Sequence, residues 1–549
     1  MNTTIVPGPA AVDIRESREP ASWWWVFLLW SPAGAFYLAH YLAACLHPGL
    51  HPTGFIQYDL PYSMACAREF ADNDLHGLLF TLPSNVDATG EPVLLQMHLW
   101  ALGQIWRMLP MDPGVLYVIF WACMGLLAVR AFTRIFDAMV PLAGAVRRWG
   151  HVLFLWGGGL LALTGEAVNL FYGRPVEDTW KHLLDLDPAH GWWMMNLGRC
   201  LILPNEAYYH LLYFTAALAF LRRRYHVAVL CLILLAASHP FSGVGGLVVF
   251  FGWSCVERWG TKGSPVPWSV PLALAATFAA SCYYYFLWLP PRMDPRLTAA
   301  FPLPYVLELR SMVPAYALVG CVAFARLRSS VRIRAFLGTP AGRMLAVMAA
   351  GHLALENHEL LVHPYQPLHF TRGYAWSALF LIGAPWLLSE AWPRSRQRWS
   401  KGAGLVAAAG LLLSLSDNIA FFALNIKREL RASPPGIWLN GQQREVLAFL
   451  DRTPSDGPLV ISQDEDLGHM VIVYTRLHAY RSHFFDEEDA WSRVRQQDAY
   501  FKGRITDPLL SGPLLVVALK DRGSFVPPGR SELIFENTAY RVFLADGPR

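Results

Sequence analysis

Long apolar runs separated by short polar segments dominate the first 424 residues of the chain. A run of about 20 apolar residues is long enough to cross a bilayer as a helix. On this criterion the pattern predicts eleven membrane-spanning helices, at about 23–46, 115–136, 151–169, 206–222, 226–238, 241–256, 268–289, 305–325, 343–361, 373–392 and 403–424. The apolar stretch 92–110 is not counted as a further span, because polar residues such as Gln96 and Arg107 interrupt it.

From residue 425 onward the pattern changes to short apolar segments punctuated by Gly and Pro. The stretch "QQREVLAFLDR" (442–452) has helical spacing, whereas "PLVISQ", "MVIVYT" and "LLVVALK" are typical of short buried strands. We therefore expect a small α/β domain over residues 425–549.

Arginine-rich loops indicate the orientation of the spans. Clusters that contain Arg130, Arg222, Arg258, Arg328 and Arg394 follow every second predicted span, beginning with the second. By the positive-inside rule this side is cytoplasmic. The segment 1–22 is then cytoplasmic, and residues 425–549 lie outside. The predicted fold class is a polytopic α-helical membrane protein with about 11 transmembrane helices, N-in/C-out, and a C-terminal extracytoplasmic α/β domain.

Composition agrees with a membrane location and with membrane lipids as partners. The chain is 54% hydrophobic and 16% charged, against roughly 25% charged in soluble domains. Its formal net charge of +4 is small for 549 residues, and we expect no nucleic-acid partner. The eight cysteines resemble neither a disulfide framework nor a thiolate metal site. The first apolar run follows a polar segment, so it is expected to remain as an anchor.

The stretch "FIQYDLPYSMACARE" (55–69) places one carboxylate, Asp59, in the first outer loop close to the membrane surface. Tyr58 and Tyr62 flank it, and partial desolvation by such neighbours favours a role as proton acceptor. Alternatively, Asp59 caps the interfacial helix that has Pro61 in its first turn. The spacing leaves both interpretations open.

This opening loop, together with the number of spans and the terminal outer domain, resembles the C-type (GT-C) glycosyltransferase superfamily, which includes protein O-mannosyltransferases and oligosaccharyltransferases. The resemblance covers residues 23–424 as the membrane domain, with the long first outer loop 47–114, and the domain after it. It implies a sugar donor carried on a polyprenyl phosphate, with Asp59 as base or metal ligand. Many members carry a paired acidic motif there, whereas Leu60 follows Asp59, so a divalent cation stays an open alternative.

A transfer of this kind needs cationic groups around the departing phosphate. The stretch "ENHELLVHPYQPLHFTRGYAW" (356–376) offers Arg372 and His369 at an outer membrane boundary. We predict that these two bind the donor phosphate. The alternative for Arg372 is an anchor at the lipid headgroups. Glu356, His358, His363 and His369 could instead converge on a metal, although their spacing matches no strong zinc signature.

Five further groups of polar residues are weaker candidates. Asp178 lies in an outer acidic loop, His239 in a tight turn that it can cap, and Asp417 toward the outer end of the last span, where a carboxylate must face the bundle. Arg199 and Glu206 precede the fourth span, where a salt bridge or a contact with lipid headgroups is the default. In the terminal domain, residues suited to hold a sugar or a peptide are Asp464, Asp466, His469, Tyr480, Arg481 and His483.

The sequence therefore predicts an integral-membrane glycosyltransferase of a bacterial inner membrane that transfers a sugar to an extracytoplasmic acceptor, which is a glycan, a lipid or a protein. A lipid-linked glycan polymerase or ligase would have a dominant outer loop late in the chain, which is lacking here. A transporter would spread polar residues through the depth of many spans. A non-catalytic membrane scaffold would tolerate loss of Asp59.

Overall fold

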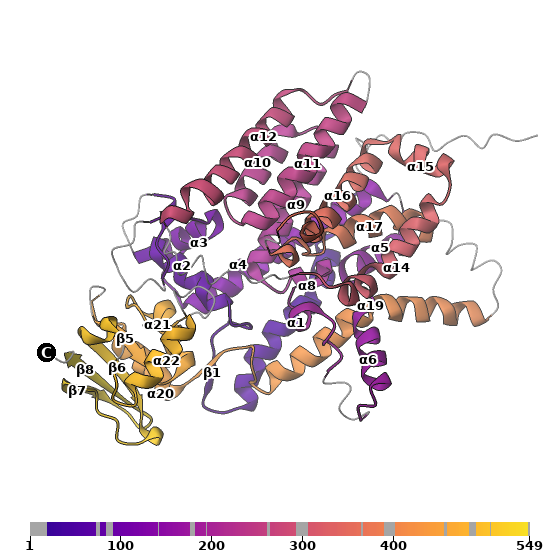
Figure 1. Ribbon diagram of the computed structural model, residues 1–549. Helices are drawn as coiled ribbons and strands as arrows, with labels where there is room; N and C mark the ends of the chain where they lie inside the picture. The colour runs from indigo at the N-terminus through magenta and orange to yellow at the C-terminus, as the bar shows by residue number, and fades with distance from the viewer. Residues whose placement is uncertain are drawn as a thin grey trace, which may run out of the picture. The chain divides into compact units, whose positions relative to one another are not determined.

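A computed structural model describes residues 19–72, 77–83, 92–140, 142–175, 182–193, 195–260, 264–292, 306–363, 366–388, 401–454, 458–482, 490–505 and 507–546 (Figure 1). The chain divides into two compact units. The first unit comprises Met1–Ala35, Trp121–Cys282 and Pro304–Asn425, and the second comprises Phe36–Phe120, Tyr283–Leu303 and Ile426–Arg549.

Helices are the only regular secondary structure among the described residues of the first unit. Neighbouring helices in space form a chain of contacts that runs from α9 through α10, α11, α16 and α17 to α14, and α12 packs on α11. The bounds of the helices that lie wholly in this unit are α5 (Gly144–Trp156), α6 (Leu161–Phe171), α8 (Leu197–Cys200), α9 (Pro204–Leu221), α10 (Tyr225–Ala236), α11 (Pro240–Gly260), α12 (Ser269–Cys282), α14 (Leu309–Leu327), α15 (Ser330–Leu337), α16 (Pro340–Glu356) and α17 (Tyr374–Trp386).

Every predicted span contains helical structure among its described residues. The division between the units falls within three long helices, α1 (Trp23–Leu46), α4 (Pro113–Met139) and α19 (Lys401–Leu430). Within the described residues, four helical segments are long and apolar enough to cross a bilayer, namely Trp23–Leu46, Pro113–Met139, Pro240–Gly260 and Ser269–Arg292. The bent pair α5 and α6 would make a fifth. The sequence-based count of eleven therefore stays a prediction.

The segment predicted as one continuous helix over 151–169 is broken by a run of three glycines. Helices α5 and α6 meet at 56° across Gly157–Gly159. A Cβ atom at Gly159 would lie 2.5 Å from the carbonyl oxygen of Pro314, so only glycine fits there. The backbone N–H of Gly158 donates to the Ser414 carbonyl at 2.7 Å. The break thus holds the chain tightly against α14 and α19.

In the second unit, the segment 47–114 is joined to the start of the terminal domain. Strand β1 (Leu50–Pro52) pairs antiparallel with β4 (Trp438–Asn440), and the Thr53 hydroxyl donates to the Ile437 carbonyl at 2.6 Å. Helix α2 (Leu60–Asp72) packs against α3 (Met97–Met108) and against α21 (Glu465–Tyr474). The loop also contains the short strands β2 (Leu79–Phe80) and β3 (Leu94–Leu95).

Residues 97–108 confirm that the stretch 92–110 is not a long span. They form α3, which has 12 residues, and a helix of this length is too short to cross a bilayer core of about 30 Å. Its buried face includes Leu99, Leu102 and Trp106. Of the polar residues that interrupt the apolar run, Gln96 immediately precedes this short helix and Arg107 lies in its last turn.

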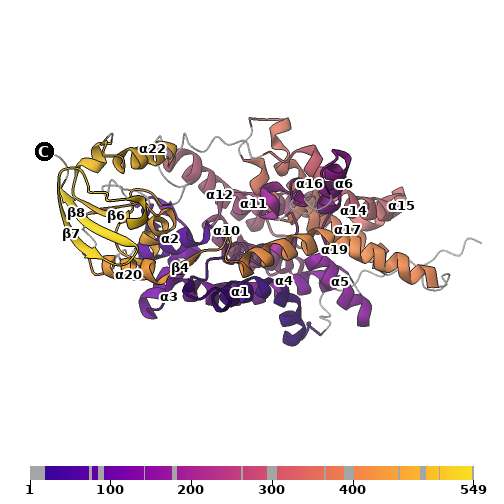
Figure 2. The ribbon, with the colours of Figure 1, turned by 90° about the horizontal axis from the view of Figure 1, so that it is seen from below.

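The terminal domain is a four-stranded sheet in the order β5–β6–β8–β7. Strand β5 (Leu459–Ser462) runs parallel to β6 (Leu514–Leu519), whereas β8 (Tyr540–Asp546) runs antiparallel to β6 and to β7 (Arg530–Glu536). Helix α22 (Ala490–Tyr500) covers one face of the sheet and α20 (Gly441–Leu450) the other (Figure 2). The expected α/β character is confirmed.

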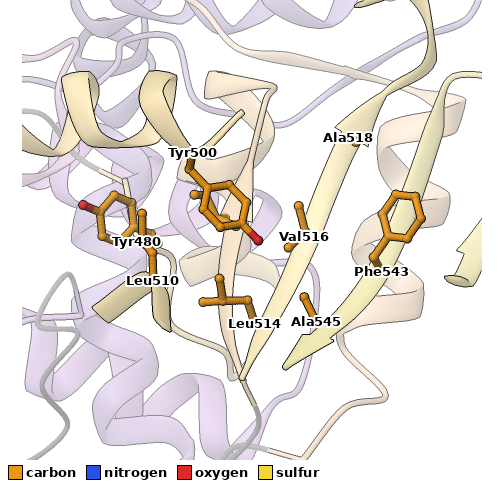
Figure 3. Close-up of a cluster of buried hydrophobic side chains, with 9 residues drawn as sticks. Tyr480, Tyr500, Leu510, Leu514, Val516, Ala518, Phe543 and Ala545 are labelled. Carbon is orange, nitrogen blue, oxygen red and sulfur yellow. The ribbon is translucent and has the colours of Figure 1, made fainter. Parts of the chain in front are cut away.

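The core of this domain lies between α22 and the sheet. Tyr500 and Tyr480 meet alternate residues of β6, including Leu514 and Val516, and Phe543 of β8 completes the layer (Figure 3). Successive residues of β6 are buried on both faces of the sheet, as is typical of a strand covered by helices on both sides.

The segment "MVIVYT" (470–475), predicted as a strand, is helical over Met470–Tyr474 and belongs to α21. Asp464 caps this helix by accepting a hydrogen bond from the Leu467 N–H at 3.2 Å, and Glu465 and Asp466 occupy its first turn. Every residue from Leu467 to Val473 is buried. A helix buried all round shows no amphipathic period, so its β-branched residues imitate a strand.

Candidate functional site

Arg372 is the centre of the polar cluster in the first unit. It lies between the 3₁₀ turn Pro367–Phe370 and the start of α17. Arg372 and the following Gly373 both have positive φ angles, of 35° and 70°. This tight connection turns the side chain inward, and Arg372 is only 6% exposed.

Three side chains from separate parts of the sequence surround the Arg372 guanidinium. Its Nη1 atom forms an ion pair with the Glu206 carboxylate. Its Nη2 atom lies 3.2 Å from His239 Nε2 and 3.4 Å from His369 Nδ1, and its Nε–H donates to the His369 carbonyl at 3.0 Å. The predicted pair Arg372 and His369 is therefore in direct contact, and His239 joins it.

Burial sets the charge of this cluster. It lowers the pKa of Arg372 to about 10, which still leaves the guanidinium charged at neutral pH. It lowers the pKa of His369 to about 3, so this imidazole is neutral there. The His369 ring packs against Phe241 and Trp193, each at a centroid distance of 4.4 Å. The cluster thus offers one cation, Arg372, and the neutral imidazole of His369.

Three helices begin at the residues of this cluster. Glu206 lies in the first turn of α9, and Pro204 is the first residue of this helix. His239 precedes α11 and accepts a hydrogen bond from the Ser242 N–H at 3.1 Å, which confirms that it caps this turn. Arg372 precedes α17. Helix N-termini carry partial positive charge, so the electrostatic field of these three helices favours an anion next to Arg372.

One group of potential metal ligands occurs among the described residues, and it adjoins this cluster. It consists of Cys200, Glu206 and His210, whose ligand atoms lie within 4.8 Å of one another. Glu206 is paired with Arg372, and both ring nitrogens of His210 already face carbonyl oxygens, of Glu206 at 2.7 Å and of Arg372 at 2.8 Å. Burial also raises the pKa of the Cys200 thiol. These residues do not fit a resident cation.

The other residues predicted for a metal near Arg372 do not converge in the part of the chain that the structure describes. Glu356 is fully buried and accepts a hydrogen bond from the Tyr316 hydroxyl at 2.7 Å. The His358 Nδ1 atom lies 2.7 Å from the Leu355 carbonyl, and His363 is exposed. The metal site considered from the spacing is therefore not formed by Glu356, His358, His363 and His369.

Asp417 has a structural partner at the glycine break. Its carboxylate Oδ1 accepts a hydrogen bond from the Ala162 N–H at 2.9 Å, so it caps the N-terminus of α6. The neighbouring Arg199 donates to the Asp417 carbonyl at 2.9 Å, to Asn418 Oδ1 at 3.0 Å and to Asp187 Oδ2 at 2.5 Å. All four residues are buried. The default ion pair expected for Arg199 is thus found, with Asp187.

The residues predicted around the catalytic base lie in the second unit. Asp59 immediately precedes α2 and is exposed, with Gln57 Nε2 donating to its Oδ2 at 2.6 Å. The neighbouring side chains of the protein therefore do not bury Asp59, and its desolvation at a membrane surface stays a prediction. The Tyr58 hydroxyl donates to the Ser482 carbonyl at 3.2 Å, and its ring lies 4.5 Å from that of His469. Tyr62 packs beside the cluster of Cys66, Phe70, Phe80 and Leu99.

Asp178 and His483 lie outside the described residues. The sequence placed Glu206 and Asp187 among polar candidates but did not pair Glu206 with Arg372 or Asp187 with Arg199, because the partners of each pair are separated in the sequence. A local signal existed for Glu206: the motif "LPNE" places Pro at the first helical position and an acid in the first turn.

No protein-family profile and no curated protein sequence matches the chain. Solved structures with similar folds include ArnT from Cupriavidus metallidurans bound to undecaprenyl phosphate, at 14% identity over 96% of this chain and 100% of that chain, with a TM-score of 0.43. They also include the apo state of ArnT, at 12% identity over 96% and 99%, with a TM-score of 0.46. The third is the Archaeoglobus fulgidus oligosaccharyltransferase tethered to an acceptor peptide, at 11% identity over 90% and 69%, with a TM-score of 0.44.

These structures belong to the superfamily that the opening loop of the sequence resembles. Because every one of these TM-scores is below 0.5, the function below is argued from the residues of this chain.

Proposed function

We propose that the protein is an integral-membrane glycosyltransferase that moves a sugar from a polyprenyl-phosphate donor to an extracytoplasmic acceptor. Arg372 binds the donor phosphate, and His239 and His369 complete its surroundings. Asp59 is the base that receives the proton of the acceptor hydroxyl. The donor class and the role of Asp59 follow the sequence resemblance, and the acceptor is a glycan, a lipid or a protein.

One observation carries the proposal: a buried guanidinium lies where three helices begin. Arg372 is charged at neutral pH although it is only 6% exposed, and Glu206 is its single carboxylate partner among the described residues. A guanidinium binds phosphate oxygens through two parallel N–H groups. Backbone N–H groups at helix N-termini favour the same charge. A headgroup anchor would instead leave the arginine exposed at the end of its helix.

The proposed roles of Arg372 and Asp59 give the following reaction. The acceptor oxygen attacks the anomeric carbon of the donor sugar and loses its proton to Asp59. The bond between the anomeric carbon and the phosphate oxygen breaks, and polyprenyl phosphate leaves with one additional negative charge. Arg372 stabilises that charge, provided that its N–H groups exchange the Glu206 carboxylate for phosphate. The exposed position of Asp59 leaves it accessible to an acceptor from the outer compartment.

Transfer assays with purified protein in lipid nanodiscs test the proposal. The donors are radiolabelled polyprenyl-phosphate sugars, offered with a mixture of envelope lipids, glycans and peptides. Wild type is expected to release polyprenyl phosphate, whereas Asp59→Asn and Arg372→Lys are expected to lose at least about 100-fold in rate. Asp72→Asn is the control for Asp59, because it lies at the other end of α2. Equal rates for wild type, Asp59→Asn and Arg372→Lys would remove both assignments.

A further inference from the structure

The terminal domain contains a polar pocket at the carboxyl ends of its two parallel strands. Its volume is about 260 Å³. Gln463 follows β5, Leu519 ends β6, and both line the pocket together with Asp498 of α22. In α/β sheets, ligands bind outside the carboxyl ends of parallel strands. The pocket lies where that rule expects a binding site.

The walls of the pocket are held in place by hydrogen bonds. Asp464 Oδ2 accepts from the Tyr540 hydroxyl at 2.5 Å and from Gln443 Nε2 at 2.9 Å. Gln463 Oε1 accepts from the Leu519 N–H at 2.8 Å. Such contacts fix the wall before any ligand arrives, which lowers the entropic cost of binding.

Some of the polar groups in the pocket have no hydrogen-bond or ion-pair partner among the described residues. Gln497 is 6% exposed and lines the pocket, yet its amide makes no hydrogen bond to any residue that the structure describes. Asp498 and Arg522 also line it, and neither forms an ion pair within the described part of the chain. An amide that lines a pocket can be satisfied by a ligand or by water. These three groups are therefore available to a ligand.

The chemistry of the lining selects one class of ligand. Acids and guanidinium groups occur side by side, since Glu465 pairs with Arg481 at 2.5 Å. Carboxylates disfavour an anion such as phosphate, and guanidinium groups disfavour a metal cation. All lining residues except Leu519 are polar, which disfavours a lipid chain. A molecule with many hydroxyl groups can donate to the acids and accept from the arginines and the amide.

We propose that this pocket binds a single neutral sugar unit of a glycan. Its volume lies just under the range of about 300–1,000 Å³ that holds drug-sized ligands, as suits one sugar ring. No residue of the proposed transfer site lines it, so binding here does not depend on the transfer reaction. The lining contains no aromatic ring, and we expect a dissociation constant of about 1 mM.

Saturation-transfer NMR on the full-length protein in lipid nanodiscs tests this site, because many detergents are themselves glycosides. The probes are methyl α-D-mannopyranoside and methyl β-D-glucopyranoside. The Asp59→Asn, Arg372→Lys background excludes a signal from the transfer site. At least one glycoside is expected to bind, and Asp498→Ala and Arg522→Ala are expected to weaken its binding by about tenfold or more.

Two exposed neighbours serve as matched controls. Arg495→Ala on α22 and Asp521→Ala beside Arg522 change the same charges without lining the pocket, and they are expected to bind as the background protein does. Gln497→Leu, checked for an unchanged thermal midpoint, is expected to lose binding as well. Three results would overturn the proposal. Neither glycoside binds, the Asp498→Ala and Arg522→Ala variants bind as tightly as the background protein, or phosphate or Mg²⁺ displaces the bound glycoside. The binding measurement uses no sugar donor and a background impaired in transfer. Loss of glycoside binding would therefore refute the pocket without bearing on the transferase assay.

Discussion

Arg372 and Glu206 form an ion pair in which each side chain is only 7% exposed. The two residues come from different helix starts, those of α17 and α9. A buried carboxylate balances the guanidinium, because an isolated charge in this environment is costly. An incoming phosphate must therefore compete with Glu206, and the pair keeps the site neutral when no anion is bound.

Glu206→Gln is expected to destabilise the protein by about 3–5 kcal/mol, because it leaves the Arg372 charge without its buried partner. Differential scanning fluorimetry in nanodiscs measures the effect as a lowered unfolding midpoint. Undecaprenyl phosphate is expected to raise the midpoint of Glu206→Gln more than that of wild type, since the anion replaces the missing carboxylate.

Glu308→Gln provides the control for this change. Glu308 pairs with Arg310 in the same unit, but both side chains are more than half exposed, so the loss is expected to stay below about 1 kcal/mol. If undecaprenyl phosphate shifts Glu206→Gln and wild type equally, the lipid phosphate does not reach Arg372.

Asp59→Asn is expected to separate catalysis from stability. The side chain is exposed, so the unfolding midpoint is expected to remain within the equivalent of about 0.5 kcal/mol. Loss of a general base is expected to reduce the transfer rate by about 10²–10⁴-fold. A variant that transfers normally would leave helix capping as the role of Asp59.

Asp417 is expected to act through the cap that it provides to α6. Asp417→Asn retains an oxygen that can accept the Ala162 N–H, whereas Asp417→Ala does not. Alanine is expected to cost about 0.5–2 kcal/mol and asparagine much less. Asp417→Asn is also expected to keep normal transfer activity. A large loss of rate in Asp417→Asn, with an unchanged midpoint, would show that the carboxylate itself is needed.

The low pKa of His369 predicts that acid destabilises the protein. The folded imidazole has a pKa of about 3, whereas an unfolded histidine titrates near pH 6.5. The unfolded state therefore binds the proton first, and the stability from this residue is lost as the pH falls below about 6.5. Lowering the pH from about 7.5 to about 5.5 is expected to cost up to about 1 kcal/mol. This acid sensitivity is expected to shrink in His369→Asn and to persist in His363→Asn, because His363 is exposed.

The apolar pattern predicted the positions of helices well and their continuity less well. The first run, 23–46, agrees with α1 at both ends, because a polar segment precedes it and Gly49 soon follows. The run 151–169 reads as one span, since glycine is apolar enough to leave the pattern intact. Its break at Gly157–Gly159 depends on contacts with Pro314 and Ser414, which no local window contains.

The candidate site was predictable where its residues are neighbours in the sequence. Arg372 and His369 are three residues apart, and their contact follows from one short turn. Glu206 and His239 reach the same guanidinium from α9 and α11, and a single sequence carries no signal for such distant partners. Asp59 was placed correctly before a helix, but its exposure depends on how the loop packs.

The pairing of β1 with β4 has a consequence for biosynthesis. Leu50 and Asn440 are hydrogen-bonded neighbours in the folded protein, yet a ribosome makes nearly four hundred residues between them. Strand β1, which precedes the Asp59 loop, can therefore form its ladder only after synthesis has passed residue 440. A polypeptide truncated ahead of Trp438 would keep the helices up to α19 but lack strand β4, the partner of β1.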